Sequence, residues 1–115
     1  MVHRVLVVDD QPDLRMLLRM HLEVDGFDVV GEAEDAASAL AQTELLQPQA
    51  VVLDQQLPDG RGTDLVGPLR AVSPGLRVIL YAGDPTDEAM AMEAGADGFV
   101  GKGEPLSRLS ALLAD

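Results

Sequence analysis

The chain has 115 residues, with 8 basic and 20 acidic side chains and a formal net charge of −12 at pH 7. A chain of this length is expected to fold as one domain, residues 1–115, without disulfides or structural metals. It contains no cysteine, which excludes disulfides, thiolate catalysis and cysteine-ligated zinc or iron–sulfur clusters.

Short β-branched runs alternate five times with longer segments of helical period. The first strand is expected at residues 4–8, and the helix after it begins at Pro12 and stops at Gly26. The second strand, residues 28–34, is less apolar, which favours a sheet edge. A helix over residues 36–46 precedes the wholly apolar run 50–53, a pattern typical of a central parallel strand.

Turn residues predict a loop over positions 57–62, and the third helix is expected to start near Thr63. We expect it to kink or break near Gly67, because Pro68 cannot donate a hydrogen bond to the carbonyl of Asp64 and crowds it. Strands over 77–81 and 98–101 and helices over 86–94 and 105–114 complete the pattern. Right-handed crossovers then close the chain as a doubly wound α/β parallel sheet.

Charged side chains follow three of the predicted strands. Asp9 and Asp10 follow the first, Asp54 the third and Lys102 the fifth, and the carboxyl ends of strands are where open α/β sheets place their sites. Like charges about 4 Å apart repel by about 4 kcal/mol at an effective dielectric constant of 20, so the three carboxylates favour binding of a cation. An all-oxygen set suits Mg²⁺.

Such a group can also react. A carboxylate beside a divalent cation and an ammonium group can attack a phosphoryl donor, because the cations neutralise charge on the transferring group. The alternative for Asp9 and Asp10 is capping of the helix that follows them. Lys102 has the alternative of an ordinary surface lysine, and Gln55 and Gln56 are interpreted as loop residues.

The combination of motifs resembles the receiver domain of bacterial two-component response regulators over nearly the whole chain. The matching segments are residues 5–10 (VLVVDD), 51–60 (VVLDQQLPDG) with Gly62, 95–99 (GADGF), and Lys102. The sequence of residues 95–105 is most similar to that of regulators with a C-terminal helix-turn-helix output domain, which act in transcription regulation. The resemblance implies a flavodoxin-like (βα)5 sandwich whose five-stranded parallel sheet has the order 2-1-3-4-5.

The resemblance also implies roles for individual residues. Asp54 would be the phosphoacceptor, taking a phosphoryl group from a sensor histidine kinase or phosphotransfer protein. Asp10 would bind Mg²⁺ directly, Asp9 mainly through water, and Gln56 through its backbone carbonyl. Lys102 would pair with Asp54 before the reaction and with the phosphoryl group after it.

Two positions depart from the family pattern. The family places Ser or Thr after the fourth strand, and this chain has Tyr81, whose phenol should overshoot the phosphoryl oxygen and either swing out or cover the pocket. Lys102 is followed by Gly103 instead of the common proline, so we expect a trans peptide bond there. Phe99 matches the family's aromatic switch position, with core packing as the alternative.

Three functions compete. The first is a phosphorylation-dependent signalling switch, which catalyses only its own phosphorylation and dephosphorylation and is not an enzyme in the usual sense. The second is an atypical receiver-like interaction module whose phosphorylation-driven switching is weakened or lost through Tyr81. A phosphohydrolase is disfavoured, because Gln56 stands where its second acid is needed.

The acidic charge argues against direct nucleic-acid binding by this domain, since such binding depends on clustered Lys and Arg. Uninterrupted apolar runs reach only five residues, against about 20 for a membrane helix, and the first residues lack the pattern of a signal peptide. The expectation is a cytoplasmic protein that does not contact membranes, with a homodimer as a further candidate assembly.

Overall fold

The computed structural model describes residues 2–115. In chain order the elements are β1 (Arg4–Val8), α1 (Pro12–Val24), β2 (Asp28–Ala33), α2 (Ala36–Leu46), β3 (Ala50–Asp54), β4 (Gln56–Leu57), β5 (Gly60–Arg61), α3 (Gly62–Val72), β6 (Arg77–Ala82), α4 (Asp87–Glu93), β7 (Gly98–Gly101) and α5 (Ser107–Ala114). Among residues 2–115, no helix qualifies as a membrane span.

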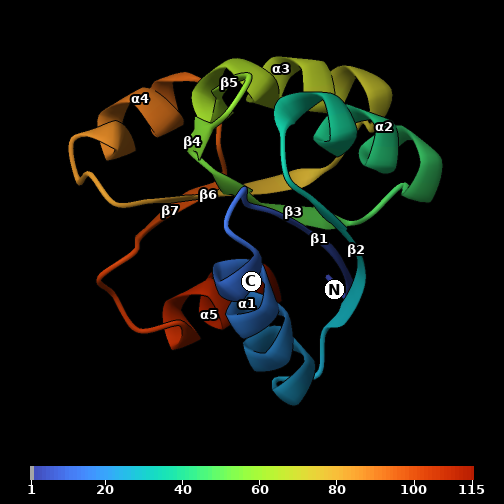
Figure 1. Cartoon of the computed structure of the whole chain (residues 1–115), viewed down its shortest axis with the longest axis vertical. Helices are drawn as coiled ribbons and strands as arrows, with labels where there is room; N and C mark the ends of the chain where they lie inside the picture. The colour runs from blue at the N-terminus through green and yellow to red at the C-terminus, as the bar shows by residue number, and fades with distance from the viewer. Residues whose placement is uncertain (1) are drawn as a thin grey trace.

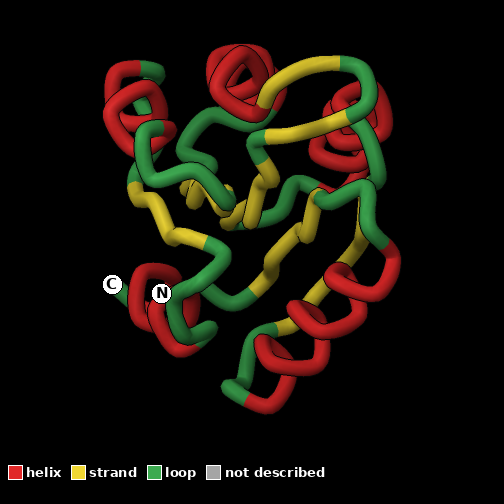
Figure 2. Tube along the Cα trace, turned by 60° about the vertical axis from the view of Figure 1, so that its left-hand side comes forward, coloured by secondary structure: helices red, strands yellow, loops and turns green. Residues whose placement is uncertain are grey.

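Five strands form one parallel sheet in the order β2-β1-β3-β6-β7. This confirms the expected doubly wound sheet of order 2-1-3-4-5, with the less apolar second strand at an edge. Helices α1 and α5 cover one face, and α2, α3 and α4 cover the other (Figure 1). Figure 2 shows the strands enclosed between these two helical layers.

Side chains alternate between the two faces and build a core on each. β3 is buried along its whole length, as its apolar run predicts for a central parallel strand. Val52 belongs to the core under α1 and α5, whereas Val51 and Leu53 belong to the core under α2, α3 and α4. The strand register therefore decides which side chains share a face at the carboxyl edge of the sheet.

Helix α3 runs without a break from Gly62 to Val72, with Pro68 inside it. The break expected near Gly67 is wrong. Pro68 and Asp64 are both exposed, so the carbonyl of Asp64 that loses its intrahelical donor lies on the solvent side of the helix. Leu65 and Leu69 are buried on the opposite side, and their packing keeps the helix continuous despite the proline.

The segment predicted as a loop after Asp54 contains a small hairpin. β4 and β5 pair antiparallel through Gln56 with Arg61 and Leu57 with Gly60. At its turn, the Asp59 carboxylate accepts hydrogen bonds from the backbone N–H groups of Ala36 (2.7 Å) and Ala37 (3.1 Å) in the first turn of α2. The hairpin is thus attached to the helix that begins beside it.

Candidate phosphoryl-acceptor site

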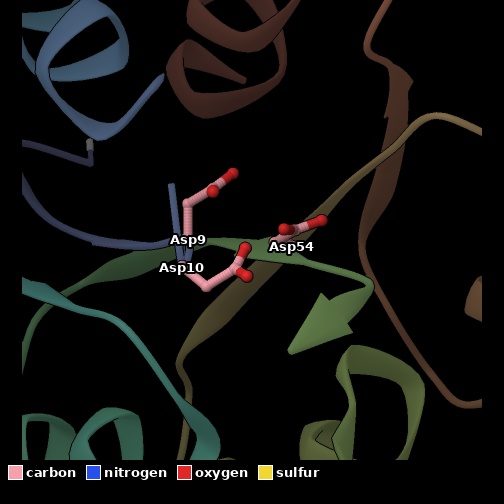
Figure 3. Close-up of side chains that lie close together, drawn as sticks. All are labelled: Asp9, Asp10 and Asp54. Carbon is pink, nitrogen blue, oxygen red and sulfur yellow. The ribbon is translucent and has the colours of Figure 1, made fainter. Parts of the chain in front are cut away.

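The strand register brings the predicted acidic residues together at the carboxyl edge of the sheet. Val8 pairs with Leu53, so Asp9 and Asp54 follow in adjacent strands, and Asp54 pairs in turn with Tyr81. Asp9, Asp10 and Asp54 offer carboxylate oxygens that all lie within 4.8 Å of one another. Figure 3 shows the three side chains close together at the ends of β1 and β3.

Asp9 is fully buried and held at three of its four polar atoms. Its N–H donates to the backbone oxygen of Ala33 (3.0 Å), Oδ1 accepts from the N–H of Gln11 (2.8 Å), and its backbone oxygen accepts from Nη1 of Arg15 (2.6 Å). Within the described chain, Oδ2 has no hydrogen-bond partner. A buried carboxylate oxygen without a partner is costly, and in this cluster it is suited to a cation.

The alternative of helix capping does not describe these carboxylates. The N-cap of α1 is Gln11, and no side chain caps it. Asp10 is exposed, so its carboxylate is open to solvent beside the buried pair.

Asp54 is 2% exposed. Its Oδ1 lies 3.1 Å from Nζ of Lys102 and 3.3 Å from the backbone nitrogen of Gln56, which donates to it. Burial, reinforced by the negative charge of Asp9, raises the pKa of the Asp54 carboxyl, and Lys102 opposes this rise only in part. The surroundings of Asp54 therefore disfavour the ionised form of its carboxyl group.

Lys102 reaches both buried carboxylates. Its Nζ lies 3.1 Å from Asp54 Oδ1 and 3.8 Å from Asp9 Oδ2, and its backbone N–H donates to the oxygen of Ala82 at 2.8 Å. Lys102 is therefore not an ordinary surface lysine, which was the alternative interpretation. No peptide bond among residues 2–115 is cis, which confirms the trans bond expected between Lys102 and Gly103.

Tyr81 does not swing out. The residue is 3% exposed and belongs to the core that includes Leu109 and Leu113 of α5. The Lys102 ammonium lies 5.8 Å from the ring centroid, within the range of a cation–π contact. Burial raises the pKa of the Tyr81 hydroxyl, so the phenol is neutral at physiological pH.

The two remaining candidate residues have different surroundings. Phe99 is 7% exposed and lies in the core on the other face of the sheet, where it also lines a cavity of about 460 Å³ with residues of the α4 and α5 ends. It is thus packed in the core and open to a cavity at the same time. Gln56 has an exposed side chain, and its carbonyl as a metal ligand stays a prediction.

Gln55 is a loop residue, as predicted, between β3 and β4, but its side chain is not exposed to solvent. Its side chain is 1% exposed, with Oε1 accepting from the N–H of Thr63 (2.9 Å) and Nε2 donating to Oγ1 of Thr63 (3.3 Å). Gln55 therefore ties the end of β3 to the first turn of α3. Its position next to Asp54 was the only available signal, because a glutamine in a short loop does not reveal which way it points.

Sequence reasoning also missed Arg15. Arg15 lies in the first turn of α1 and donates back to the carbonyl of Asp9, three residues before the helix, and its ion pair with Glu32 reaches β2 (3.1 Å). Neither contact follows from helical periodicity, which marks only apolar positions.

Comparison with known proteins agrees with this geometry. Residues 5–114 match the family model of the response regulator receiver domain. The chain is 41% identical to the probable transcriptional regulatory protein TcrX of Mycobacterium tuberculosis, over 95% of this chain and 49% of that protein. It spans about half the length of the curated relatives it matches.

Solved structures give the same result. A two-component response regulator of the LuxR family from Aurantimonas sp. SI85-9A1 matches with a TM-score of 0.90 and 30% identity, over 99% of this chain and 86% of that one. A response regulator protein from Burkholderia pseudomallei, solved with a phosphorylated aspartic acid, calcium ion and citrate, has a TM-score of 0.86 and 25% identity, over 96% and 66% of the two chains. The chain therefore belongs to the family of response regulator receiver domains.

Proposed function

We propose that this receiver domain is a phosphorylation-dependent switch in which Asp54 accepts a phosphoryl group from a histidine of a partner kinase or phosphotransfer protein, with Mg²⁺ held by the acidic cluster. The observation that carries the proposal is the pairing of a buried Asp54 with Lys102 at 3.1 Å, beside an Oδ2 atom of Asp9 that has no hydrogen-bond partner among residues 2–115. The phosphorylated aspartic acid of the Burkholderia pseudomallei regulator supports it by similarity.

The donor set fits Mg²⁺. The three carboxylates are hard oxygen ligands within 4.8 Å of one another, and Asp9 Oδ2 lacks another partner among the described residues. Asp10 would bind directly, Asp9 mainly through water, and the Gln56 carbonyl would add an oxygen. When bound, the metal neutralises charge on the transferring group.

The protein's own groups then have separate tasks. An Asp54 carboxylate oxygen attacks the phosphorus atom, and the bond from phosphorus to the donor nitrogen breaks. Lys102, already beside Asp54, supplies a positive charge that can pair with the phosphoryl oxygens afterwards. The receiver is a signalling module rather than a classical enzyme, and self-phosphorylation is the chemistry proposed for it.

The names of its relatives support a role for the switch in transcription regulation. Several of these are named as transcriptional regulators and are about twice as long as the match. We assign the domain to the input side of such a cytoplasmic regulator, with a sensor kinase as phosphodonor and a second copy of the chain as a candidate partner.

The deciding experiment is incubation with Mg²⁺ and a small acyl phosphate, followed by intact mass measurement. The wild type should gain the mass of one phosphoryl group, and Asp54→Asn should not, because the amide is not a nucleophile here. Asp59→Asn, a nearby acid on the hairpin, is the matched control and should still be labelled. Equal labelling of wild type and Asp54→Asn would place the nucleophile elsewhere.

A second candidate function is a receiver-like interaction module with weakened switching, and the burial of Tyr81 favours it. The family's Ser or Thr hydroxyl reports the phosphoryl group, whereas the Tyr81 ring is fixed in the core beneath α5. In this case labelling of Asp54 would proceed but change little elsewhere. Comparing the labelled and unlabelled chain by NMR separates the two candidates.

A further inference from the structure

The backbone of Asp9 is held by residues outside the acidic cluster. Nη1 of Arg15 donates to its carbonyl oxygen at 2.6 Å, and the N–H of Asp9 donates to Ala33 in β2. Oδ1 accepts from the N–H of Gln11. With those three atoms engaged, only Oδ2 is free to meet Lys102 and the other carboxylates.

Arg15 is itself anchored on the edge strand. Its Nε lies 3.1 Å from Oε1 of Glu32, and Oε2 of the same carboxylate lies 2.6 Å from Nη1 of Arg19. The Arg15 side chain is only 16% exposed. Hydrogen bonds from Arg19 first and Arg15 second lower the pKa of Glu32 against its partial burial, so Glu32 stays charged well into the acidic range.

We propose that Arg15 is a positioning residue for the metal site, bridging Glu32 of β2 to the backbone of Asp9 so that Asp9 Oδ2 stays aimed into the cluster. Nothing in this bridge touches the reacting atoms. The guanidinium suits the task because its planar, forked donors reach a carboxylate and a carbonyl at once. The proposal rests on the proposed function, since it assumes that Mg²⁺ binds the cluster.

The matched control lies one helical turn away. Arg19 pairs with the same Glu32 from the same helix, but its other contacts are Val29 and Glu23 rather than Asp9. Arg19→Met therefore removes a comparable ion pair without releasing Asp9. Arg15→Met removes both the ion pair and the hydrogen bond to Asp9.

The first measurement is Mg²⁺ affinity, followed through amide shifts or calorimetry. Groups that support metal ligands typically change affinity by about 10- to 100-fold, so Arg15→Met should raise the half-saturating Mg²⁺ concentration about tenfold or more. Arg19→Met should stay within about twofold of the wild type, whatever its melting temperature. Arg15→Lys, which can reach one acceptor at a time, should fall between wild type and Arg15→Met.

The second measurement needs no metal. The N–H of Gln11 is protected by the Asp9 carboxylate, so its hydrogen exchange in metal-free protein should be faster in Arg15→Met than in Arg19→Met. If Arg15→Met fails to fold, Glu32→Gln, which loosens the anchor and keeps Arg15, should give the same two changes in weaker form.

The outcomes separate the two ideas. A wild type that ignores Mg²⁺ would refute the metal site of the proposed function. A wild type that binds Mg²⁺, with Arg15→Met and Arg19→Met equal in affinity and in Gln11 exchange, would overturn the role of Arg15 alone. Arg15→Lys indistinguishable from wild type would show that positive charge suffices and would also overturn the bridge.

Discussion

At the scale of single residues, the site combines groups that oppose each other's charge. Asp54 and Asp9 are both buried, and one lysine faces both of them. The raised pKa of Asp54 means that folding makes its ionisation less favourable, even with Lys102 present. The two buried carboxylates that we propose for cation binding and phosphoryl transfer thus lower the stability of the fold.

This conflict predicts a stability change with a defined pH dependence. Below about pH 4, the ordinary pKa of an aspartate, Asp54 is protonated in both folded and unfolded chains and contributes no difference. Between that pH and the raised folded pKa, the folded state holds more protons than the unfolded one, so stability falls as pH rises and levels off above the folded pKa. Asp54→Asn should therefore melt a few degrees above wild type at pH 7 and lose that gain towards pH 4.

Thermal unfolding of the two proteins from pH 4 to 8, without divalent metal, measures this difference. Asp13→Asn, an exposed acid in the first turn of α1, is the control and should show no such gain. A lower melting temperature for Asp54→Asn at pH 7 would mean that its pair with Lys102 outweighs burial and repulsion.

At the scale of elements, tertiary packing can outweigh the local conformational preferences of residues such as glycine and proline. Helix α3 keeps Gly67 and Pro68 at exposed positions while its buried leucines hold it against the sheet. Two glycines of this helix have opposite surroundings. A Cβ at Gly67 would meet nothing within 4 Å apart from its chain neighbours and the backbone of its own helix, whereas one at Gly62 would lie 2.6 Å from the backbone oxygen of Asp54.

The two glycines predict opposite mutational effects. Gly67→Ala should stabilise the domain by less than the full gain of about 0.5–1 kcal/mol for alanine in a helix interior, because the ring of Pro68 disfavours the helical conformation of a residue with a Cβ before it. Gly62→Ala should destabilise it, since the methyl group would press on the backbone beside the nucleophile. Urea unfolding of both variants measures the difference, and a destabilised Gly67→Ala would show that the helix is distorted at that residue.

The segment from α4 to β7 is where the response to phosphorylation should be seen. A receiver switches when the phosphoryl group shifts the balance between two states. We propose that the Ser or Thr hydroxyl of the family is missing here, since Tyr81 is fixed in one core and Ala82, which ends β6 and shares the other core with Phe99, has no hydroxyl. Lys102 alone would then report the phosphoryl group, and the contact energy would fall by about one charge-assisted hydrogen bond, about 1.5–3 kcal/mol. That loss changes the ratio of the two states tenfold or more.

We therefore expect small amide shifts or exchange changes over residues 86–102 when wild type is labelled or bound to beryllofluoride, and larger ones in Tyr81→Thr. Tyr81→Phe, which keeps the ring beneath Lys102, should behave like wild type. A full rearrangement in wild type that Tyr81→Thr weakens would show that the phenol is part of the switch.

At the scale of the whole molecule, an acidic chain concentrates three carboxylates at one edge of the sheet. Mg²⁺ should stabilise the unphosphorylated fold by about 2.7 kcal/mol at a hundredfold excess over its dissociation constant. Asp10→Ala should abolish the accompanying rise in melting temperature, and Asp13→Ala should not. Added salt alone also stabilises an acidic protein by screening the repulsion between its charges, so the thermal unfolding is measured at constant ionic strength. A wild-type melting temperature that does not change with Mg²⁺ under these conditions would show that the cluster does not bind the ion.

Much of this molecule is predictable from the sequence, because buried parallel strands and the acids that follow them leave local patterns. The strand at residues 4–8, the edge position of β2 and the meeting of Asp9, Asp10 and Asp54 all follow in that way. The continuity of α3 does not, since it depends on packing that outweighs a local penalty. The contacts of Arg15 and Gln55 do not follow from the sequence. Arg15 contacts a residue that is distant along the chain, and the direction of the Gln55 side chain has no periodic signal.

The segment that follows Asp54 at the end of β3 is fastened at two points. Gln55 is bonded to α3 through Thr63, and Asp59 is bonded to the first turn of α2. The conformational entropy of ordering this loop is therefore lost once, during folding, rather than at each encounter with a phosphodonor. A phosphodonor therefore meets a surface that is already ordered. Differences in phosphorylation rate between donors should arise from the contacts that each donor makes. Association should be fast for any donor whose shape fits.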